Sequence, residues 1–219
     1  MPKPIAGFLF DLDGTLVDTE HLHYQSTLAV LAEWDLVLQP EDFAPFIGFS
    51  EIPYWTALRD KFGLSATPEF LAGRRTEEYA RLLHPNSIEP LPGVLDLLDA
   101  LEQAGLPAAV ASAAPRGQME AGLGAAGLAE RLPVYRSGLE DVAPGRSKPK
   151  PDVYLAAAEA IDVDPAACIA IEDSGVGMRA AIAAGCFTVC VPCPSHPTHE
   201  SGLAHLTLPR IDALIPHLR

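Results

Sequence analysis

An apolar segment near the start of the chain ends abruptly in two aspartates. Residues 5–10 carry no charge, and Asp11-Leu12-Asp13-Gly14-Thr15 follows them directly. A short apolar segment of this kind predicts a buried strand of a parallel sheet, and open α/β sheets bind ligands where such strands end. On a regular strand the two carboxylates would point to opposite faces, but Gly14 permits a turn that brings both to one site. The segment predicts an α/β fold with Asp11 and Asp13 at one sheet edge.

Paired acids at such an edge suit a limited set of tasks. Two carboxylates in one place can bind a divalent cation, attack a substrate as a nucleophile or transfer protons. A pair of solvated turn aspartates is the alternative for so short a motif. The remainder of the chain decides between these two interpretations.

Predicted strands and helices alternate after about residue 90, and this pattern is typical of a doubly wound parallel sheet, a Rossmann-like core. The predicted helices cover about 94–104, 116–126, 151–160 and 175–184, and the strands cover 108–111, 134–136, 168–171 and 188–191. The preceding region instead predicts only helices, over about 20–34, 51–62 and 68–83. We therefore predict a core formed by residues 1–16 and 89–219, with an all-helical cap domain inserted over 17–88.

Composition and charge narrow the class of protein. Hydrophobic residues make up 48% of the 219 residues, which is enough for a substantial core. The formal net charge of −14 argues against a nucleic-acid partner. The apolar stretch before Asp11 is too short for a signal peptide or a membrane span, and no other segment reaches the required length. We expect a cytoplasmic protein without a membrane partner, and nothing in the sequence indicates its oligomeric state.

Four cysteines lie in the last quarter of the chain, and without a secretory signal we expect them to be reduced. They are Cys168, Cys186, Cys190 and Cys193. Cys190 and Cys193, followed by His196 and His199, also raise a zinc hypothesis. This segment lacks the spacing of common zinc modules, and Cys190 lies in a predicted strand, so zinc is the weaker interpretation.

Polar residues follow the other predicted strands as well. Ser112 ends one strand, Glu172 and Asp173 follow another, and Lys148 lies in a connecting loop. Each has a simple alternative as a turn hydroxyl, a helix cap or a solvated charge. Because parallel strands end at one edge of a sheet, we expect these side chains to converge on the aspartate pair. A lysine and several acids so placed suit a phosphate group held between a metal ion and a cation.

These motifs, taken in order, resemble those of the haloacid dehalogenase superfamily, in the branch with a helical cap inserted after the first motif. The resemblance covers essentially the whole chain. The four matching motifs are Asp11-Leu12-Asp13-Gly14-Thr15, Ser112 after a strand, Lys148-Pro149-Lys150-Pro151-Asp152, and Glu172-Asp173-Ser174 running through Gly177 to Ala183-Ala184-Gly185.

The resemblance implies a magnesium-dependent phosphatase that hydrolyses a small phosphomonoester, such as a sugar phosphate. It implies that Asp11 attacks phosphorus to form an aspartyl phosphate, while Asp13 protonates the leaving oxygen and then activates water. By the same match, Ser112 and Lys148 would hold the phosphoryl oxygens.

The resemblance also implies the metal site. Magnesium would be held by the Asp11 carboxylate, the Asp13 main-chain carbonyl and Asp173, with Glu172 assisting.

Other activities of the same superfamily fit the sequence less well. Dehalogenases lack the second aspartate of the first motif, which this chain has as Asp13. Phosphonate hydrolysis needs a cap lysine, and the only lysine between residues 17 and 88 is Lys61, in a polar stretch that predicts a helix surface. A non-catalytic metal- or ligand-binding protein is the alternative of another class, although it would not need to keep both aspartates.

A phosphosugar mutase similar to β-phosphoglucomutase is the nearest alternative. His23 falls where that enzyme has a hinge histidine, which favours the mutase. However, Ile47 and Glu51 stand where the mutase has two basic residues that bind a second phosphate, and an acid would repel that dianion. Thr15 also resembles the residue that the phosphatases, more than the mutases, have at this position. A monophosphate hydrolase is therefore the favoured interpretation.

Substrate selection is expected to lie with the cap. The loop around Gly48 would close over the leaving group. Arg75 in the cap and Arg116 just after Ser112 are candidate substrate contacts, with solvated helix charges as the alternative. Four aromatic residues could line the pocket or form the core of the cap: Phe46, Phe49, Tyr54 and Trp55.

Overall fold

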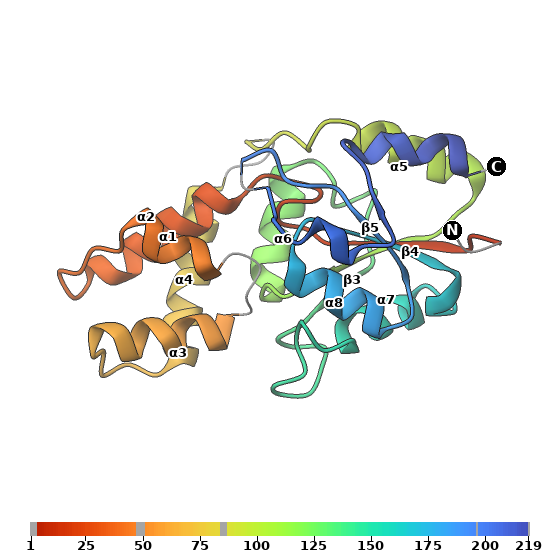
Figure 1. Ribbon diagram of the computed structural model, residues 1–219. Coiled ribbons are helices and arrows are strands. Elements are labelled where there is room, and N and C mark those ends of the chain that lie inside the picture. Colours follow the sequence, from red (N-terminus) through yellow and green to blue (C-terminus); the bar gives the residue numbers. More distant parts are fainter. Residues whose placement is uncertain (1–3, 47–50, 84–86, 196, 219) are drawn as a thin grey trace.

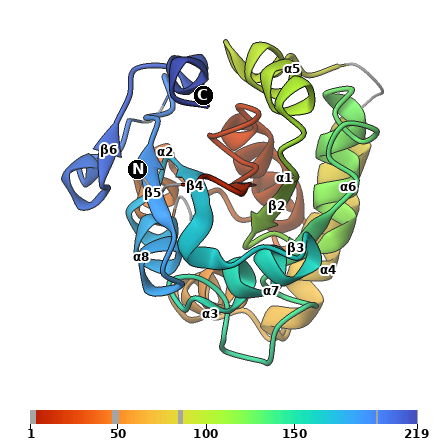
Figure 2. The same cartoon turned by 90° about the vertical axis from the view of Figure 1, so that its right-hand side faces the viewer.

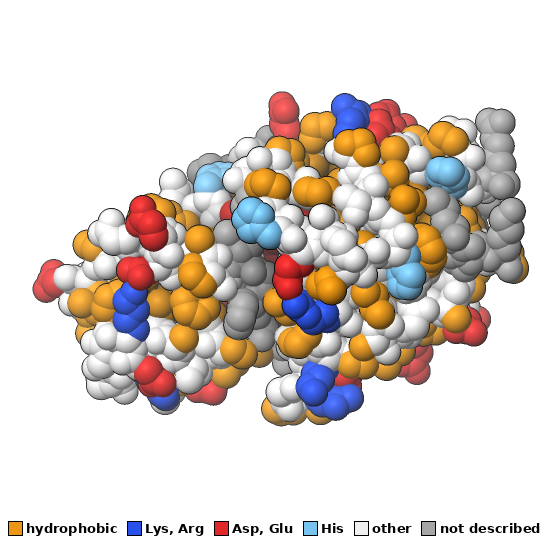
Figure 3. All heavy atoms as spheres, in the orientation of Figure 1, with side chains coloured by type: hydrophobic (Ala, Val, Ile, Leu, Met, Phe, Trp, Pro, Cys, Tyr) orange, Lys and Arg blue, Asp and Glu red, His pale blue; other side chains and the backbone are white. Residues whose placement is uncertain are grey.

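The computed structural model describes residues 4–46, 51–83, 87–195 and 197–218 and consists of two lobes. One lobe is built from helices α1 to α4 and the other surrounds a sheet. Both described chain ends lie on the sheet lobe, at the side away from α1 to α4 (Figure 1). On the face shown in Figure 3, Lys and Arg side chains are dispersed beside Asp and Glu over both lobes. Among the described residues, no helix is long and apolar enough to cross a membrane.

The sheet has six parallel strands in the order β3-β2-β1-β4-β5-β6. After β1 the chain forms the strands on one side and then crosses to β4 on the other, so β1 lies at the point where the strand order reverses. Ligands bind at this point in doubly wound sheets. The strands are β1 (Gly7–Phe10), β2 (Ala108–Ser112), β3 (Tyr135–Ser137), β4 (Cys168–Glu172), β5 (Phe187–Cys190) and β6 (Leu206–Thr207).

Helices cover both faces of the sheet, which explains why its central strands are apolar on both sides. Side chains alternate along β1: Phe8 and Phe10 pack into one hydrophobic cluster and Leu9 into the other. In Figure 2, α5 and the C-terminal segment lie on one side of the sheet, and α7 and α8 on the other. These helices are α5 (Val94–Ala104), α6 (Arg116–Ala125), α7 (Asp152–Ala160) and α8 (Gly175–Ala183). The predicted α/β fold with a doubly wound parallel sheet and a helical cap is confirmed.

The cap has its own hydrophobic core, which includes Leu31, Trp55, Leu58 and Leu71. Its helices are α1 (Glu20–Ala32), α2 (Pro40–Phe43), α3 (Glu51–Phe62) and α4 (Pro68–Leu82). The predicted start of the last of these is confirmed, because the Thr67 hydroxyl accepts a hydrogen bond from the Phe70 amide at 3.2 Å.

The two chain crossings between the lobes lie side by side. Val17 forms an isolated antiparallel bridge with Pro90, and the Leu91 amide donates to the Leu16 carbonyl at 2.8 Å. Two adjacent crossings let the cap turn as a unit, so we propose the domain limits 1–16 and 89–219 for the core and 17–88 for the cap.

Several short elements differ from the prediction. The third strand lies over Tyr135–Ser137, one residue later than the predicted 134–136. The helix α2, the edge strand β6 and the 3-10 helix at Ile211–His217 were not predicted. Elements of two to seven residues carry too few turns or alternations to give a periodic signal, and Pro216 interrupts the last one.

Candidate active site

The end of β1 forms the turn that the sequence predicts. The Asp11 amide still donates to the Ile171 carbonyl of β4 at 3.0 Å, and the chain then leaves the sheet. Gly14 has φ of +84°, in the left-handed region, and its amide donates to the Val17 carbonyl at 2.7 Å. As a result, Asp11 and Asp13 line one pocket between the core and the cap.

A buried lysine joins the ends of β1 and β4. Lys148 Nζ lies 2.7 Å from Asp11 Oδ1 and 2.6 Å from Glu172 Oε1. The Tyr154 hydroxyl also donates to Glu172 Oε1, at 2.6 Å, and the Ser174 hydroxyl donates to Glu172 Oε2 at 3.0 Å. Both oxygens of this fully buried carboxylate are therefore fixed by donors.

A glycine allows α8 to begin directly over that carboxylate. A Cβ at Gly177 would lie 1.8 Å from Glu172 Oε1, so no larger residue fits there without a shift. The Ser174 hydroxyl accepts from the Gly177 amide at 3.1 Å and caps the helix. Gly177 of the fourth motif is therefore needed because a side chain there would collide with Glu172.

The electrostatics of this cluster favour an added cation. Burial raises the pKa of Asp11 well above its ordinary value, and the nearby Glu172 and Asp173 raise it further, while Lys148 opposes them. Burial would lower the pKa of Lys148, but Asp11 and Glu172 outweigh it and raise that pKa. Lys148 contacts two of these buried acids, Asp11 and Glu172, and Asp173 adds a third carboxylate nearby, so a bound cation would further offset their mutual repulsion.

The same three acids could supply ligands to a metal ion. Asp11, Glu172 and Asp173 each offer a carboxylate oxygen, and these atoms lie within 4.8 Å of one another. Oxygen donors at this separation fit a hard divalent cation such as Mg²⁺. Three of the four predicted metal residues therefore lie together at the sheet edge, and the part of the Asp13 carbonyl stays a prediction.

Asp13 contacts the cap side of the pocket. Its Oδ1 lies 3.1 Å from His23 Nε2 on α1 and accepts a hydrogen bond from the Thr19 hydroxyl. The ring of His23 stacks on Tyr79 with centroids 4.7 Å apart. Burial would raise the pKa of Asp13, but the charge of His23 and hydrogen bonds from His23 and Thr19 outweigh it and hold that pKa below its usual value. The predicted hinge role of His23 remains a prediction, and this contact supports it.

Ser112 ends β2 at the same edge. It is buried and lines the pocket, and its hydroxyl accepts from the Ala114 amide at 3.1 Å. Its position beside the carboxylates of β1 follows from the register, because Phe10 pairs with Val110 two residues earlier.

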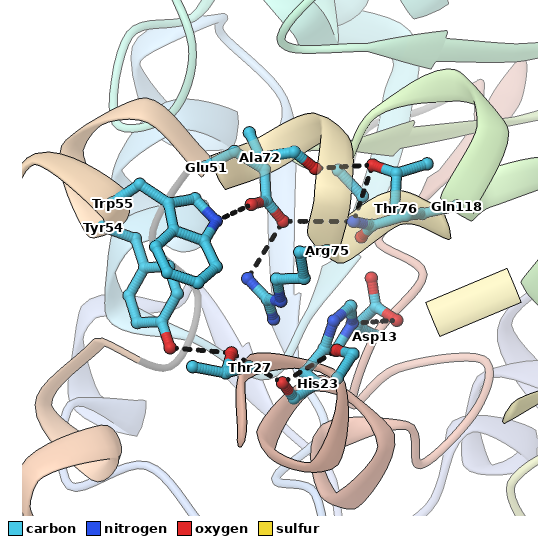
Figure 4. Close-up of polar contacts among 12 residues, drawn as sticks. Asp13, His23, Thr27, Glu51, Tyr54, Trp55, Ala72, Arg75, Thr76 and Gln118 are labelled. Carbon is cyan, nitrogen blue, oxygen red and sulfur yellow. Dashed lines mark hydrogen bonds and ion pairs between the residues drawn. The ribbon is translucent and has the colours of Figure 1, made fainter. Parts of the chain in front are cut away.

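The cap contributes a buried ion pair to the opposite wall of the pocket. Arg75 on α4 lies 2.9 Å from Glu51 Oε1 on α3, and both side chains are buried. Trp55 Nε1 donates to Glu51 Oε2 at 3.0 Å, and Gln118 Nε2 on α6 donates to Glu51 Oε1 at 3.3 Å. Figure 4 shows the Arg75 guanidinium between this carboxylate and the Asp13–His23 pair. Burial would lower the pKa of Arg75, but Glu51 outweighs it and raises that pKa.

Comparison with known proteins identifies the family. A family model described as haloacid dehalogenase-like hydrolase matches residues 5–185.

The chain belongs to the haloacid dehalogenase-like hydrolases.

Two known proteins and one solved structure are similar to this hydrolase over most of its length. It is 32% identical over 192 residues to the Arabidopsis thaliana protein SUPPRESSOR OF QUENCHING 1, chloroplastic, covering 85% of this chain but only 18% of that longer protein. It is 32% identical to hexitol phosphatase A of Escherichia coli, over 86% of this chain and 84% of the relative. The crystal structure of a CbbY variant from Rhodobacter sphaeroides in complex with xylulose-(1,5)bisphosphate matches with a TM-score of 0.85, 26% identity and 96% coverage of both chains.

Not every predicted substrate contact of the hydrolase reaches the pocket. Arg116 is half-buried, pairs with Asp141 and is not among the described residues that line the pocket, so its substrate contact stays a prediction that this position does not support. A residue at the start of a helix can follow a site residue and still point away, because the turn reorients the chain. Arg75 does line the pocket, and Gly48 lies outside the described residues.

The cap aromatic residues divide between two roles. Phe46 and Tyr54 line the pocket while also packing in the cap core, whereas Trp55 is fully buried in that core and is not among the described pocket residues; Phe49 lies outside the described residues. Lys61 pairs with Asp42 at 2.5 Å on the helix surface, as predicted.

The zinc hypothesis gains no geometric support from the described residues. Cys190 and Cys193 are buried, His199 lies beside Glu200 in a different pocket, and His196 falls outside the described part of the chain. Within that part, the group of three potential metal ligands is the acidic one at the sheet edge.

Two residues of the site carry no signal in the sequence. Gln118 lies on the buried face of α6, and Tyr154 lies on the buried face of α7 among alanines and valine. The only indication of their role in the sequence is a polar residue on a helix face that is predicted to be buried. Such a position does not show which group the polar atom contacts.

Proposed function

We propose that this hydrolase removes phosphate from a small phosphorylated sugar or polyol, with magnesium, through an aspartyl-phosphate intermediate. The observation that carries the proposal is the buried Lys148, which lies between Asp11 and Glu172 and lines the pocket. A cation in that position offsets the repulsion between an anionic nucleophile and an anionic ester. The names of the relatives, a hexitol phosphatase and a CbbY protein with a bound sugar bisphosphate, support the same substrate class.

The residues would divide the reaction into two displacements. In the first, an Asp11 oxygen forms a bond to phosphorus, the ester P–O bond breaks, and Asp13 gives a proton to the leaving oxygen, which requires the bound substrate to raise the pKa of Asp13 from the lowered value that His23 and Thr19 impose. In the second, Asp13 takes a proton from water, whose oxygen bonds to phosphorus and releases Asp11 and phosphate. Ser112 and Lys148 would hold the phosphoryl oxygens in both steps.

Magnesium would be held by Asp11, Asp173 and the Asp13 carbonyl, with Glu172 assisting, and would supply charge stabilisation to the phosphoryl group. His23 and Thr19 orient the carboxyl of Asp13 from the cap side. Because these two residues belong to the linker and cap, movement of the cap would change the contacts of the proton-transfer group.

The mutase alternative is supported by the His23–Asp13 contact alone. It needs a second phosphate site under the cap, where the buried carboxylate of Glu51 lies instead. The products separate the two functions: a hydrolase releases free phosphate, whereas a mutase returns an isomeric sugar phosphate.

The direct test is phosphate release from a panel of hexose phosphates, phosphoglycolate and β-glucose 1-phosphate, with and without magnesium. Release that stops in chelator and in Asp11→Asn, but persists in the exposed control Asp99→Asn, would support the proposal. Isomerisation without free phosphate would favour the mutase. Absence of any turnover would favour a non-catalytic binding protein.

A further inference from the structure

The pocket extends from Asp11 to the underside of the cap, and this second region would receive the leaving group. We define the leaving-group region by four charged or polar residues that line the pocket there: Glu20, Glu51, Arg75 and Gln118. It contains two carboxylates and one guanidinium, so its formal charge is negative. The inference rests on the proposed function, because a leaving group exists only if an ester is cleaved.

The positive charge of Arg75 is already matched. Its Nη1 lies 2.9 Å from Glu51 Oε1, and the two side chains are only 7% and 4% exposed. Donors from Trp55 and Gln118 hold the same carboxylate, so Glu51 cannot swing away without leaving buried donors unpaired. A ligand phosphate would have to compete with a fixed carboxylate for this guanidinium, and would meet repulsion from it.

Three buried atoms of the region have no hydrogen-bond partner among the described residues. They are Arg75 Nε, which donates, and Gln118 Oε1 and Glu20 Oε2, which accept. Buried polar atoms are normally paired, so these atoms are available to a ligand. A hydroxyl group both donates and accepts and can satisfy either kind, whereas a phosphate dianion only accepts and would leave the two acceptors unpaired.

We propose that the leaving-group region binds a neutral, hydroxyl-bearing group and rejects a second phosphate, with Glu51 as the residue that determines this specificity. The preferred substrate is therefore a polyol or sugar with a single phosphate. The relatives do not decide between one phosphate and two, since one is named for a hexitol and another was crystallised with a bisphosphate.

The test compares substrates that differ by one phosphate group. Fructose 1-phosphate and fructose 1,6-bisphosphate share the same sugar, and we expect kcat/KM for the monophosphate to be at least about tenfold higher, because like charges at a binding site cost several kcal/mol. In Glu51→Gln this ratio should fall toward one, since the variant removes the repelling charge and frees Arg75. The control Glu77→Gln makes the same change on the exposed surface of α4 and should keep the wild-type ratio.

A second variant keeps the inference testable if Glu51→Gln does not fold. Gln118→Leu removes the free acceptor, together with the donor to Glu51, without changing charge, and should raise KM for fructose 1-phosphate more than KM for p-nitrophenyl phosphate, whose leaving group has no additional hydroxyl. Binding of the two fructose phosphates to Asp11→Asn, measured by calorimetry, gives the same comparison without turnover.

The outcomes separate the two proposals. Equal kcat/KM for the two fructose esters, or an unchanged ratio in a folded Glu51→Gln, would overturn the inference and leave the phosphatase proposal intact. If no ester is hydrolysed, the phosphatase proposal fails, and calorimetry then decides whether the region still prefers the monophosphate.

Discussion

The two halves of the pocket are assembled by different means. The core half collects Asp11, Glu172 and Lys148 from two strand ends and one loop at a single sheet edge. The cap half brings Glu51 and Arg75 together from the separate helices α3 and α4. Parallel strand ends share an edge by topology, whereas side chains on separate helices meet only through tertiary packing. The residues of the proposed chemistry therefore depend on the sheet topology, whereas the leaving-group contacts can change with the packing of the cap helices.

The largest effect should come from the acid that lies between the two halves. Asp13→Asn removes the group that would protonate the leaving oxygen and activate water, so we expect kcat to fall by about 10²–10⁴-fold on a sugar phosphate. Steady-state phosphate release measures this, with Asp99→Asn as the exposed control. A kcat within about threefold of the wild type would mean that the core half does not carry the chemistry as proposed.

Removing the core cation should affect stability as well as turnover. Lys148→Met leaves Asp11 and Glu172 buried without their partner, and breaking such a pair costs about 3–5 kcal/mol of unfolding free energy. Urea unfolding in chelator measures the loss, and magnesium should restore part of it by binding the same carboxylates.

The control is Lys61→Met, which breaks a surface pair in the cap and should change the unfolding free energy by less than about 1 kcal/mol. Equal losses for the two lysines would contradict the assignment of Lys148 to a buried charge cluster.

A matched pair of tyrosines tests how the Glu172 carboxylate is positioned. The Tyr154 and Tyr135 hydroxyls each donate to a carboxylate at 2.6 Å, the first to Glu172 in the core and the second to Glu120 on the exposed surface. Tyr154→Phe should cost about 1.5–3 kcal/mol and weaken the apparent magnesium affinity about 10–100-fold. Tyr135→Phe should leave magnesium affinity unchanged, and a similar affinity loss in both would refute a positioning role for Tyr154.

The difference between the two halves also limits what the sequence can predict. Asp11, Asp13, Ser112, Lys148, Glu172 and Asp173 were all predicted to share a site, because each follows a strand or lies in a loop that ends at one edge. Arg116 shows how limited this reasoning is, since adjacency in sequence to Ser112 does not fix side-chain direction, and the guanidinium pairs with Asp141. Gln118 and Tyr154 were missed because nothing local distinguishes a buried polar atom that contacts the site from one that contacts the surface.

The smallest effects are expected at two helix N-caps, which allow the same kind of hydrogen bond to be compared between the cap and the core. Thr67 caps α4 in the cap and Ser174 caps α8 in the core, each accepting from a backbone amide, at 3.2 Å and 3.1 Å. Thr67→Ala should cost about 1 kcal/mol and leave kcat/KM within about twofold, because the hydroxyl serves only the helix.

Ser174→Ala should instead lower kcat/KM as well, since the same hydroxyl donates to Glu172 Oε2 at 3.0 Å and lies on the pocket wall. Unfolding curves and steady-state kinetics on both variants measure the two effects separately. If the two variants lose stability alike and keep the same kcat/KM, local helix capping and the proposed chemistry are independent even in the core. If only Ser174→Ala loses activity, the residues that begin α8 serve the fold and the reaction through the same atom.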